Sequence, residues 1–338
     1  MTQIHRGLVF GHLALVERVL GTQEDPNKVL DFLRTYAAAN PFLEEIVEEG
    51  TEESLAWTLN ALSTNPSRQI NKNTVYLALE AACRLGKVGM VRILLACGVD
   101  VASVVWGDLF GWETEDPKEW KETPGDISPL GHACNIGNLE LVYMLLDSGM
   151  PVSGNEGIKG MSPLWVASWR GHLDLVRMLI LHGADPNDWC LGGFSWSIAF
   201  TSGHHHILQY FLDGVQEVED GQDDICWTID MEKCSWKGLS ALDDACKKGN
   251  VEFIRFLLDH GLDINKVSEE QTKPRYLPLN LAVESALDED FHLVKFLVEE
   301  AGADVNGMDR GGLTPLHIVA AGLYRPHLME YLLGKGAD

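Results

Sequence analysis

The sequence lacks the features that mark membrane, secreted and nucleic-acid-binding proteins. It holds no run of about 18 uncharged apolar residues, so no membrane span is expected. Residues 1–20 lack the basic start and the continuous apolar core of a signal peptide. Lys and Arg number 26 against 50 Asp and Glu, and the net charge of −24 disfavours nucleic acid and anionic membranes as partners. We therefore predict a cytoplasmic protein, with a nuclear location also allowed.

Cysteine is scarce, and its spacing forms no recognisable framework. The chain has seven Cys with no C-x-x-C pair and no zinc-type Cys/His spacing. Cys83, Cys134 and Cys246 each follow an Ala at the same place in three similar segments. Because a small buried position favours Ala or Cys, we expect these three in the core and in a reducing compartment.

The common motifs of catalysis are also missing. No G-x-x-x-x-G-K-[ST] or G-x-G-x-x-G phosphate loop and no G-x-S-x-G nucleophile motif occurs. The run His204-His205-His206 suggests a metal, but successive helical side chains point about 100° apart and cannot easily hold one ion. We predict no metal and no cofactor, and favour a protein that is not an enzyme while leaving that question open.

What the sequence does contain is a repeated segment. From Ser162 to Asn187 it reads S-P-L-W-V-A-S-W-R-G-H-L-D-L-V-R-M-L-I-L-H-G-A-D-P-N. Pro in a first helical turn and Gly after a helix end predict two short helices with a hinge at Gly171. The pattern returns at 128–149 and at 314–338, and the equivalent hinge Gly137 stands 34 residues before Gly171.

This unit resembles the ankyrin repeat, which has about 33 residues and a T-P-L-H-x-A signature. The resemblance implies an all-α solenoid of helix-turn-helix copies joined by β-hairpin-like arms, in which about eight copies share one core. We predict two domains, a degenerate N-terminal repeat plus helical insertion at 1–72 and the repeat array at 73–338. Two arms of the array, at 104–126 and 215–236, are expanded beyond the family pattern.

The two ends of the chain depart from the repeat pattern. After a short copy at 2–20, apolar residues at helical spacing predict three helices, Asn27–Ala39, Pro41–Glu49 and Glu52–Leu62. These helices fit either a worn repeat or an insertion. The last helix, 328–333, is apolar on the face where a terminal repeat should be polar, so we expect the chain to continue or this face to be covered.

The position of the signature histidine holds His only in the end copies, at His5 and His317. In the family this side chain forms hydrogen bonds at the junction of hairpin and helix. The inner copies carry other residues there: Glu80, Gly131, Trp165, Ser197, Asp243 and Asn280. Two interpretations stay open, neutral drift and remodelling of the inner helices for a ligand.

The resemblance also implies that hairpin tips and inner-helix positions form a concave binding groove. Those positions carry basic and aromatic residues in an otherwise acidic protein, and Trp and Arg are frequent at binding hot spots. The predicted groove residues are Lys159, Trp165, Trp169, Arg170, Trp189, Trp236, Lys237, Asp243, Lys247, Lys248 and Arg310. Another interpretation is that the Trp side chains only pack against the expanded arms.

We predict a protein-protein interaction module that binds an acidic segment with an aromatic or aliphatic anchor along this groove. One alternative is an enzyme or binder of a small molecule, of the cyclase or isomerase type, whose pocket is closed by the Trp-rich arms. In that case Asp243 and Glu80 would serve as acids or bases. A second alternative is a regulatory fragment of a larger protein.

Overall fold

The structure is a computed structural model of the whole chain. The residues it describes are 42–63, 72–97, 128–153, 161–190, 193–216, 225–233, 240–266, 277–288, 291–309, 311–322 and 325–338. The predicted copy at 2–20, the helix at 27–39 and the arm at 104–126 lie outside this part. The chain divides into two compact units, residues 1–185 and 186–338.

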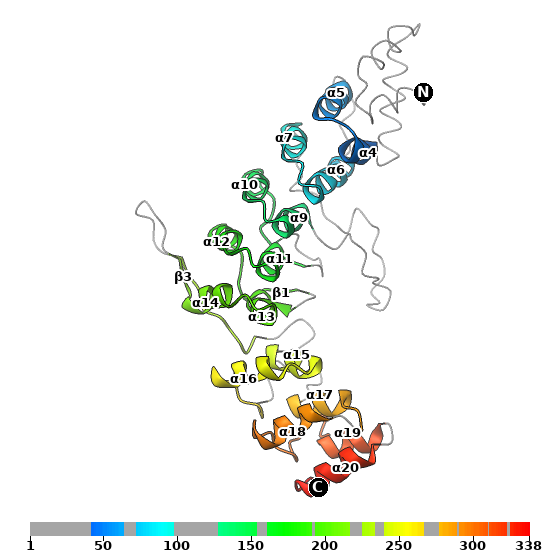
Figure 1. Cartoon of the computed structure of the whole chain (residues 1–338), viewed down its shortest axis with the longest axis vertical. Helices are drawn as coiled ribbons and strands as arrows, with labels where there is room; N and C mark the ends of the chain where they lie inside the picture. Colours follow the sequence, from blue (N-terminus) through cyan, green and yellow to red (C-terminus); the bar gives the residue numbers. More distant parts are fainter. Residues whose placement is uncertain are drawn as a thin grey trace. The chain divides into compact units, whose positions relative to one another are not determined.

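The first unit is a stack of helix pairs arranged in two rows (Figure 1). The first helices of the pairs pack on one another in chain order and form what we call the inner row: α4 (Phe42–Glu49), α6 (Lys72–Arg84), α9 (Pro129–Ile136) and α11 (Pro163–Arg170). The second helices form the outer row: α5 (Glu52–Ser63), α7 (Val88–Ala96), α10 (Leu139–Asp147) and α12 (Leu173–Leu181).

The second unit continues the same alternation of inner and outer helices. Its inner helices are α13 (Ser195–Thr201), α15 (Ala241–Lys248), α17 (Pro278–Ser285) and α19 (Pro315–Ala321). Its outer helices are α14 (His205–Asp213), α16 (Val251–Asp259), α18 (His292–Glu299) and α20 (Pro326–Gly334). Two antiparallel hairpins complete it, β1 (Trp189–Cys190) with β2 (Gly193–Phe194), and β3 (Val215–Gln216) with β4 (Ile225–Cys226). The predicted helical repeat architecture is confirmed.

The helix ends follow from the residues predicted to set them. Ser162 Oγ accepts a hydrogen bond from the Trp165 N–H at 3.1 Å and so satisfies an orphan donor at the start of α11. Gly171 ends that helix at a φ of +81°, in the left-handed region that side chains rarely adopt. At Gly137 a Cβ would also lie only 2.7 Å from the His172 ring, so close packing between successive hinges requires glycine there.

Residues 42–63 occupy the position of a repeat. The two helices predicted here, Pro41–Glu49 and Glu52–Leu62, are confirmed as α4 and α5 to within a residue at each end. Helix α4 packs on the inner helix α6, and α5 packs on the outer helix α7. Lys87 Nζ donates to the Val47 and Glu48 carbonyls at 2.7 and 2.9 Å, which ties the next hinge to the end of α4. This arrangement favours the interpretation of a worn repeat.

The core lies between the two rows of each unit. Cys83, Cys134 and Cys246 are all 0% exposed, which confirms that they are packing residues. Burial raises the pKa of each thiol well above its ordinary value. None of the described helices is both long enough and apolar enough to cross a membrane.

Three asparagines in the second unit each join the loop of one repeat to the loop of the next: Asn187, Asn265 and Asn306. Asn265 Nδ2 donates to the Gly302 carbonyl at 3.0 Å, and its Oδ1 accepts from the Asp304 N–H at 2.8 Å. Asn306 makes the same two bonds to Gly336 and Asp338. These inter-repeat asparagines fix the register of successive loops.

The asparagine contacts locate the extra residues of the second expanded arm. Asn187 Nδ2 donates to the Thr228 carbonyl and Asn187 Oδ1 accepts from the Asp230 N–H, both at 2.8 Å. Thr228–Asp230 therefore takes the place that the G-A-D sequence has in other repeats. Of the arm predicted at 215–236, residues 215–216 pair with 225–226 and residues 228–230 bond to Asn187, while 217–224 and 234–236 lie outside the described part.

Candidate functional site

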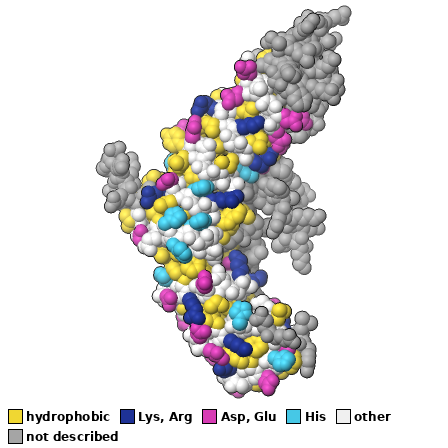
Figure 2. Space-filling view, in the orientation of Figure 1, with side chains coloured by type: hydrophobic (Ala, Val, Ile, Leu, Met, Phe, Trp, Pro, Cys, Tyr) yellow, Lys and Arg dark blue, Asp and Glu magenta, His cyan; other side chains and the backbone are white. Residues whose placement is uncertain are grey.

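Seven of the predicted groove residues fall in the described part, and the two units hold them separately. The first unit holds Trp165, Trp169 and Arg170, and the second holds Trp189, Asp243, Lys247 and Lys248. Lys159, Trp236, Lys237 and Arg310 lie outside the described residues. Figure 2 shows basic and acidic side chains interspersed over the helices of both units, so the excess of acid is not one continuous patch on this face.

Trp169 and Arg170 form a held pair at the end of α11. The Trp169 side chain is 38% exposed, and the Arg170 guanidinium carbon lies 4.4 Å from its ring centroid. Arg170 Nε donates to Asn135 Oδ1 of the neighbouring inner helix at 2.7 Å. Among the described residues no carboxylate pairs with this guanidinium, so it presents a positive charge above an accessible indole.

Trp165 supports this pair from the core. Its side chain is only 6% exposed, and its ring centroid lies 5.8 Å from that of Trp169. The four-residue spacing predicted that the two indoles would share one helix face, and the structure brings them together. Because Trp165 is buried, Trp169 alone of the two can contact a ligand.

Arg170 stands directly before a hinge glycine, and in the two preceding repeats this position holds an exposed apolar residue. Leu85 directly follows the last residue of α6, Ile136 is the last residue of α9, and each is 43% exposed. A Cβ on Gly86 would lie 3.8 Å from Ile136 Cδ1, so the ends of these helices are neighbours. We call Leu85, Ile136, Trp169 and Arg170 the inner-helix row.

Leu85 and Ile136 were not among the predicted groove residues, although the sequence carried a signal for them. Each stands directly before a hinge glycine, as Arg170 does. In this family the position is one of the variable places on the inner helix. Transferring the register from α11 to the two preceding repeats would have found both residues.

The N-terminal end of the inner-helix row is acidic. Arg84, which precedes Leu85, is paired with Glu48 of α4 at 2.7 Å and offers no free charge. Burial first, and then the neighbouring carboxylates of Glu48 and Glu80, raise the pKa of Glu44 above its ordinary value. The positive end of the row is therefore at Arg170.

In the second unit the predicted polar residues have different partners. Lys248 Nζ pairs with Asp244 of its own helix at 2.7 Å, whereas Lys247 is exposed and forms no ion pair with another described residue. The Asp243 carboxylate accepts hydrogen bonds from Ser240 N–H and Oγ–H at 2.8 and 2.9 Å and completes a capping box. Of these residues, Lys247 offers the accessible charge, and Asp243 secures the start of α15.

Trp189 holds the β1–β2 hairpin against the core. Its ring meets Phe194 edge-on, with centroids 4.9 Å apart, and Phe194 stacks on Trp196 at 5.5 Å. Trp196 is fully buried and contacts Phe253 of α16 at 6.0 Å. The half-buried Trp189 thus belongs to an aromatic column that fixes the hairpin.

The residues proposed for acid or base chemistry lie away from the cavity that the structure shows in the second unit. A cavity of about 430 Å³ lies between α16 and α18, and neither Glu80 nor Asp243 borders it. Glu80 Oε1 instead lies 3.6 Å from His132 Nε2 within the first unit. The described residues contain no group of three His, Cys, Asp or Glu side chains placed to hold a metal ion.

Comparison with known families gives three matches along the chain. The family described as ankyrin repeats in three copies matches residues 111–188, the single ankyrin repeat matches 237–269, and ankyrin repeats in many copies match 279–333. The human ASB11 ankyrin repeat domain, a solved structure, aligns over 77% of this chain and 98% of that chain, with a TM-score of 0.46 and 20% identity.

Two curated relatives are much longer than the region they share with this chain. The ankyrin repeat and KH domain-containing protein mask of Drosophila melanogaster is 32% identical over 161 residues, 46% of this chain and 4% of that protein. The B-cell lymphoma 3 protein homolog of Mus musculus is 28% identical over 217 residues, 62% of this chain and 44% of that protein. The chain therefore spans less than half the length of each.

Proposed function

Because this chain belongs to the ankyrin-repeat family, whose repeats are protein-interaction modules, we propose that it binds a protein partner through the inner-helix row. The observation that carries the proposal is the exposed Trp169 indole with Arg170 held over it. The six described cysteines form no disulfide, which fits a reducing location, and we propose the cytoplasm.

The Trp169 and Arg170 side chains are already held in place, so binding a partner would cost them little conformational entropy. Trp165 lies beneath the Trp169 ring, and Asn135 holds Arg170 in place above it. A side chain already fixed in its bound rotamer avoids an ordering cost of about 0.5–1.5 kcal/mol. Trp and Arg are also the residues most often found at the energetic centre of an interface.

The row also suggests the chemistry of the partner. Ile136 and Leu85 add exposed apolar side chains on the two preceding repeats, and these side chains suit an aliphatic or aromatic anchor. Arg170 carries the accessible positive charge of the row, and a planar guanidinium matches a carboxylate bidentately. We therefore propose an acidic segment with one apolar anchor as the ligand.

The test compares two substitutions of exposed aromatic residues in the full-length chain. Trp169→Ala removes the exposed indole of the row, and Tyr143→Ala removes a 57% exposed ring from the outer helix α10. We expect proteins captured by the unmodified chain to be retained by the Tyr143 variant and lost by the Trp169 variant. Loss of one central hot spot typically costs about 2 kcal/mol or more, roughly 30-fold in affinity.

Hydrogen exchange on a purified complex locates the contact independently. We expect slower amide exchange around Leu85, Ile136 and Trp169 when the partner is bound. Equal capture by both variants, with unchanged exchange at the ends of α6, α9 and α11, would rule out the inner-helix row as the binding site.

A further inference from the structure

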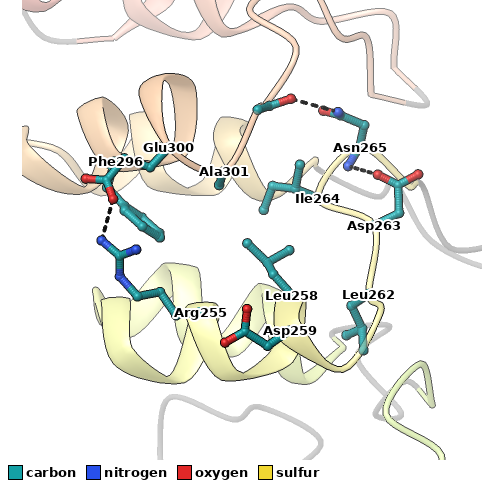
Figure 3. A pocket seen from close by; sticks show the side chains of 11 residues that line it. Arg255, Leu258, Asp259, Leu262, Asp263, Ile264, Asn265, Phe296, Glu300 and Ala301 are labelled. Atoms are coloured by element: carbon teal, nitrogen blue, oxygen red, sulfur yellow. Dashed lines mark hydrogen bonds and ion pairs between the residues drawn. The ribbon is translucent and has the colours of Figure 1, made fainter.

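A cavity in the second unit is lined by the outer helices α16 and α18 and by the turns that follow them (Figure 3). Its volume of about 430 Å³ is in the range of small-ligand and side-chain sites. Figure 3 shows the Arg255–Glu300 pair at one side of the cavity and Asn265 at the other, with Leu258 and Ile264 between them. The cavity thus has an apolar middle and polar ends.

One wall of the cavity is a turn that contains an extra residue. Gly261 stands five residues after Phe256, whereas Gly302 stands six residues after Phe296, the equivalent position in the next repeat. A backbone hydrogen bond spans the extra residue: the Ala303 N–H donates to the Leu297 carbonyl, six residues earlier, at 2.8 Å. After α16 the matching bond spans five residues, from Leu262 to Leu257. The wider turn after α18 borders the cavity.

The charge around the cavity is negative. Three carboxylates line it, those of Asp259, Asp263 and Glu300, against a single cation, Arg255. Arg255 is already engaged, because it pairs with Glu300 and its guanidinium carbon lies 4.5 Å from the Phe296 ring centroid. No cation among the described residues pairs with Asp259, which is exposed at the end of α16.

The helix dipoles of α16 and α18 add to the negative charge around the cavity. Both α16 and α18 end at the cavity, at Asp259 and Glu299, and the C-terminus of a helix carries a partial negative charge. The apolar side chains Leu258 and Ile264 lie between the charged ends, with Ile264 only 5% exposed. A ligand that fits must combine an apolar stem with a positive tip.

We propose that this cavity binds a lysine side chain from a basic segment of a partner protein. The four-carbon stem of lysine would pack on Leu258 and Ile264, and its compact ammonium would reach the Asp259 carboxylate. This surface differs from the inner-helix row in its helices and in the sign of its charge. The inference therefore does not depend on the proposed function.

Fluorescence anisotropy with the full-length chain tests the proposal. The probe is a fluorescein-labelled peptide with Leu-Lys-Leu at its centre and two flanking Lys, and its matched control carries N-acetylated lysine at the central position. We expect Asp259→Asn to weaken binding of the first peptide by about fivefold, the upper range for an exposed ion pair. Asp174→Asn on α12 changes the net charge equally and should leave binding unchanged, as should Trp169→Ala.

Each other outcome overturns the proposal. Equal weakening by Asp259→Asn and Asp174→Asn would reveal general attraction of a basic peptide to an acidic protein. Equal binding of the acetylated peptide, or no binding of either, would show that the cavity does not recognise the ammonium. Displacement by free spermidine at the affinity of the peptide would assign the site to a small polyamine. If the proposal is correct, amide hydrogen exchange should also slow at residues 258–265 and 300–304 when the peptide is bound.

Discussion

At the scale of single residues, the position of the signature histidine shows how one site in a repeat changes its role. His317 Nδ1 lies 2.7 Å from Thr314 Oγ1 and accepts from its N–H, as the resemblance implies for this histidine. Asp243 does the same for Ser240, so a different side chain preserves the cap. The Trp165 N–H still donates to Ser162, but the Trp165 side chain does not complete a capping box and packs against the Trp169 ring instead. The same position in three repeats therefore serves a cap in two of them and aromatic packing in the third.

Cysteine reactivity is the first prediction at this scale. We expect Cys226, which is exposed, to react with iodoacetamide in the native protein, and Cys83, Cys134 and Cys246 to react only after unfolding. The thiolate is the nucleophile, and burial both covers these three thiols and raises their pKa, so little thiolate is accessible at pH 8.

Peptide mass spectrometry of labelled protein measures this order of reaction. Labelling in urea, where all seven cysteines are accessible, provides the reference for each peptide. Rapid native labelling of Cys134 would contradict the packing of α9 against its neighbours.

At the scale of elements, the ends of helices were predictable and the loops were less so. Ser-Pro starts and glycine ends predicted α11 and α12 because caps are local chemistry. The place of Thr228–Asp230 was not predictable, because it shares with G-A-D only the aspartate and is identified by its bonds to Asn187. The one-residue insertion at the end of α18 is visible in the sequence, but a cavity depends on packing that no spacing rule describes.

The inter-repeat asparagines lead to a prediction about stability. Asn265→Ala removes two hydrogen bonds between successive loops, and each contributes about 0.5–1.5 kcal/mol. We expect the free energy of unfolding to fall by about 1–2 kcal/mol in urea titrations. Asn265→Asp keeps the acceptor for Asp304 and loses the donor to Gly302, so its effect should be smaller.

A matched control for this prediction is Gln209→Ala. Gln209 donates to Asp213 within the single helix α14, at 2.7 Å, and joins no two repeats. Surface changes of this kind usually stay within about 0.5 kcal/mol. If the Gln209 and Asn265 variants lost stability equally, the loop contacts would not be what couples the repeats.

At the scale of the whole molecule, the proposed interaction site is built from residues of several repeats rather than from one motif. No single repeat contains the inner-helix row, because Leu85, Ile136 and Trp169 come from three different repeats, at the ends of the inner helices α6, α9 and α11. Register alone can predict which positions join such a row. Which of them are exposed depends on the size of neighbouring side chains, as the burial of Trp165 beneath Trp169 shows. The sequence therefore predicts which residues could join the row, and side-chain packing determines which of them are exposed.

Because each repeat packs only on its neighbours, a destabilising substitution in one repeat should lower the stability of the adjacent repeats most. Each repeat contacts only adjacent repeats, so stability is close to a sum of local terms and nearest-neighbour interfaces. Leu257→Ala in α16 empties a fully buried position and should cost about 2–5 kcal/mol. Amide exchange measured by mass spectrometry should accelerate most in α15 and α16, less in α17 and α18, and least in α4 to α7.

Leu181→Ala on α12 is the control for this gradient, because Leu181 is 42% exposed and its loss leaves no cavity. We expect little change in exchange anywhere in that variant. Uniform acceleration from α4 to α20 after Leu257→Ala would mean that the repeats unfold as one cooperative unit. A gradient that falls with distance from α16 would instead show that stability is coupled only from each repeat to its neighbours.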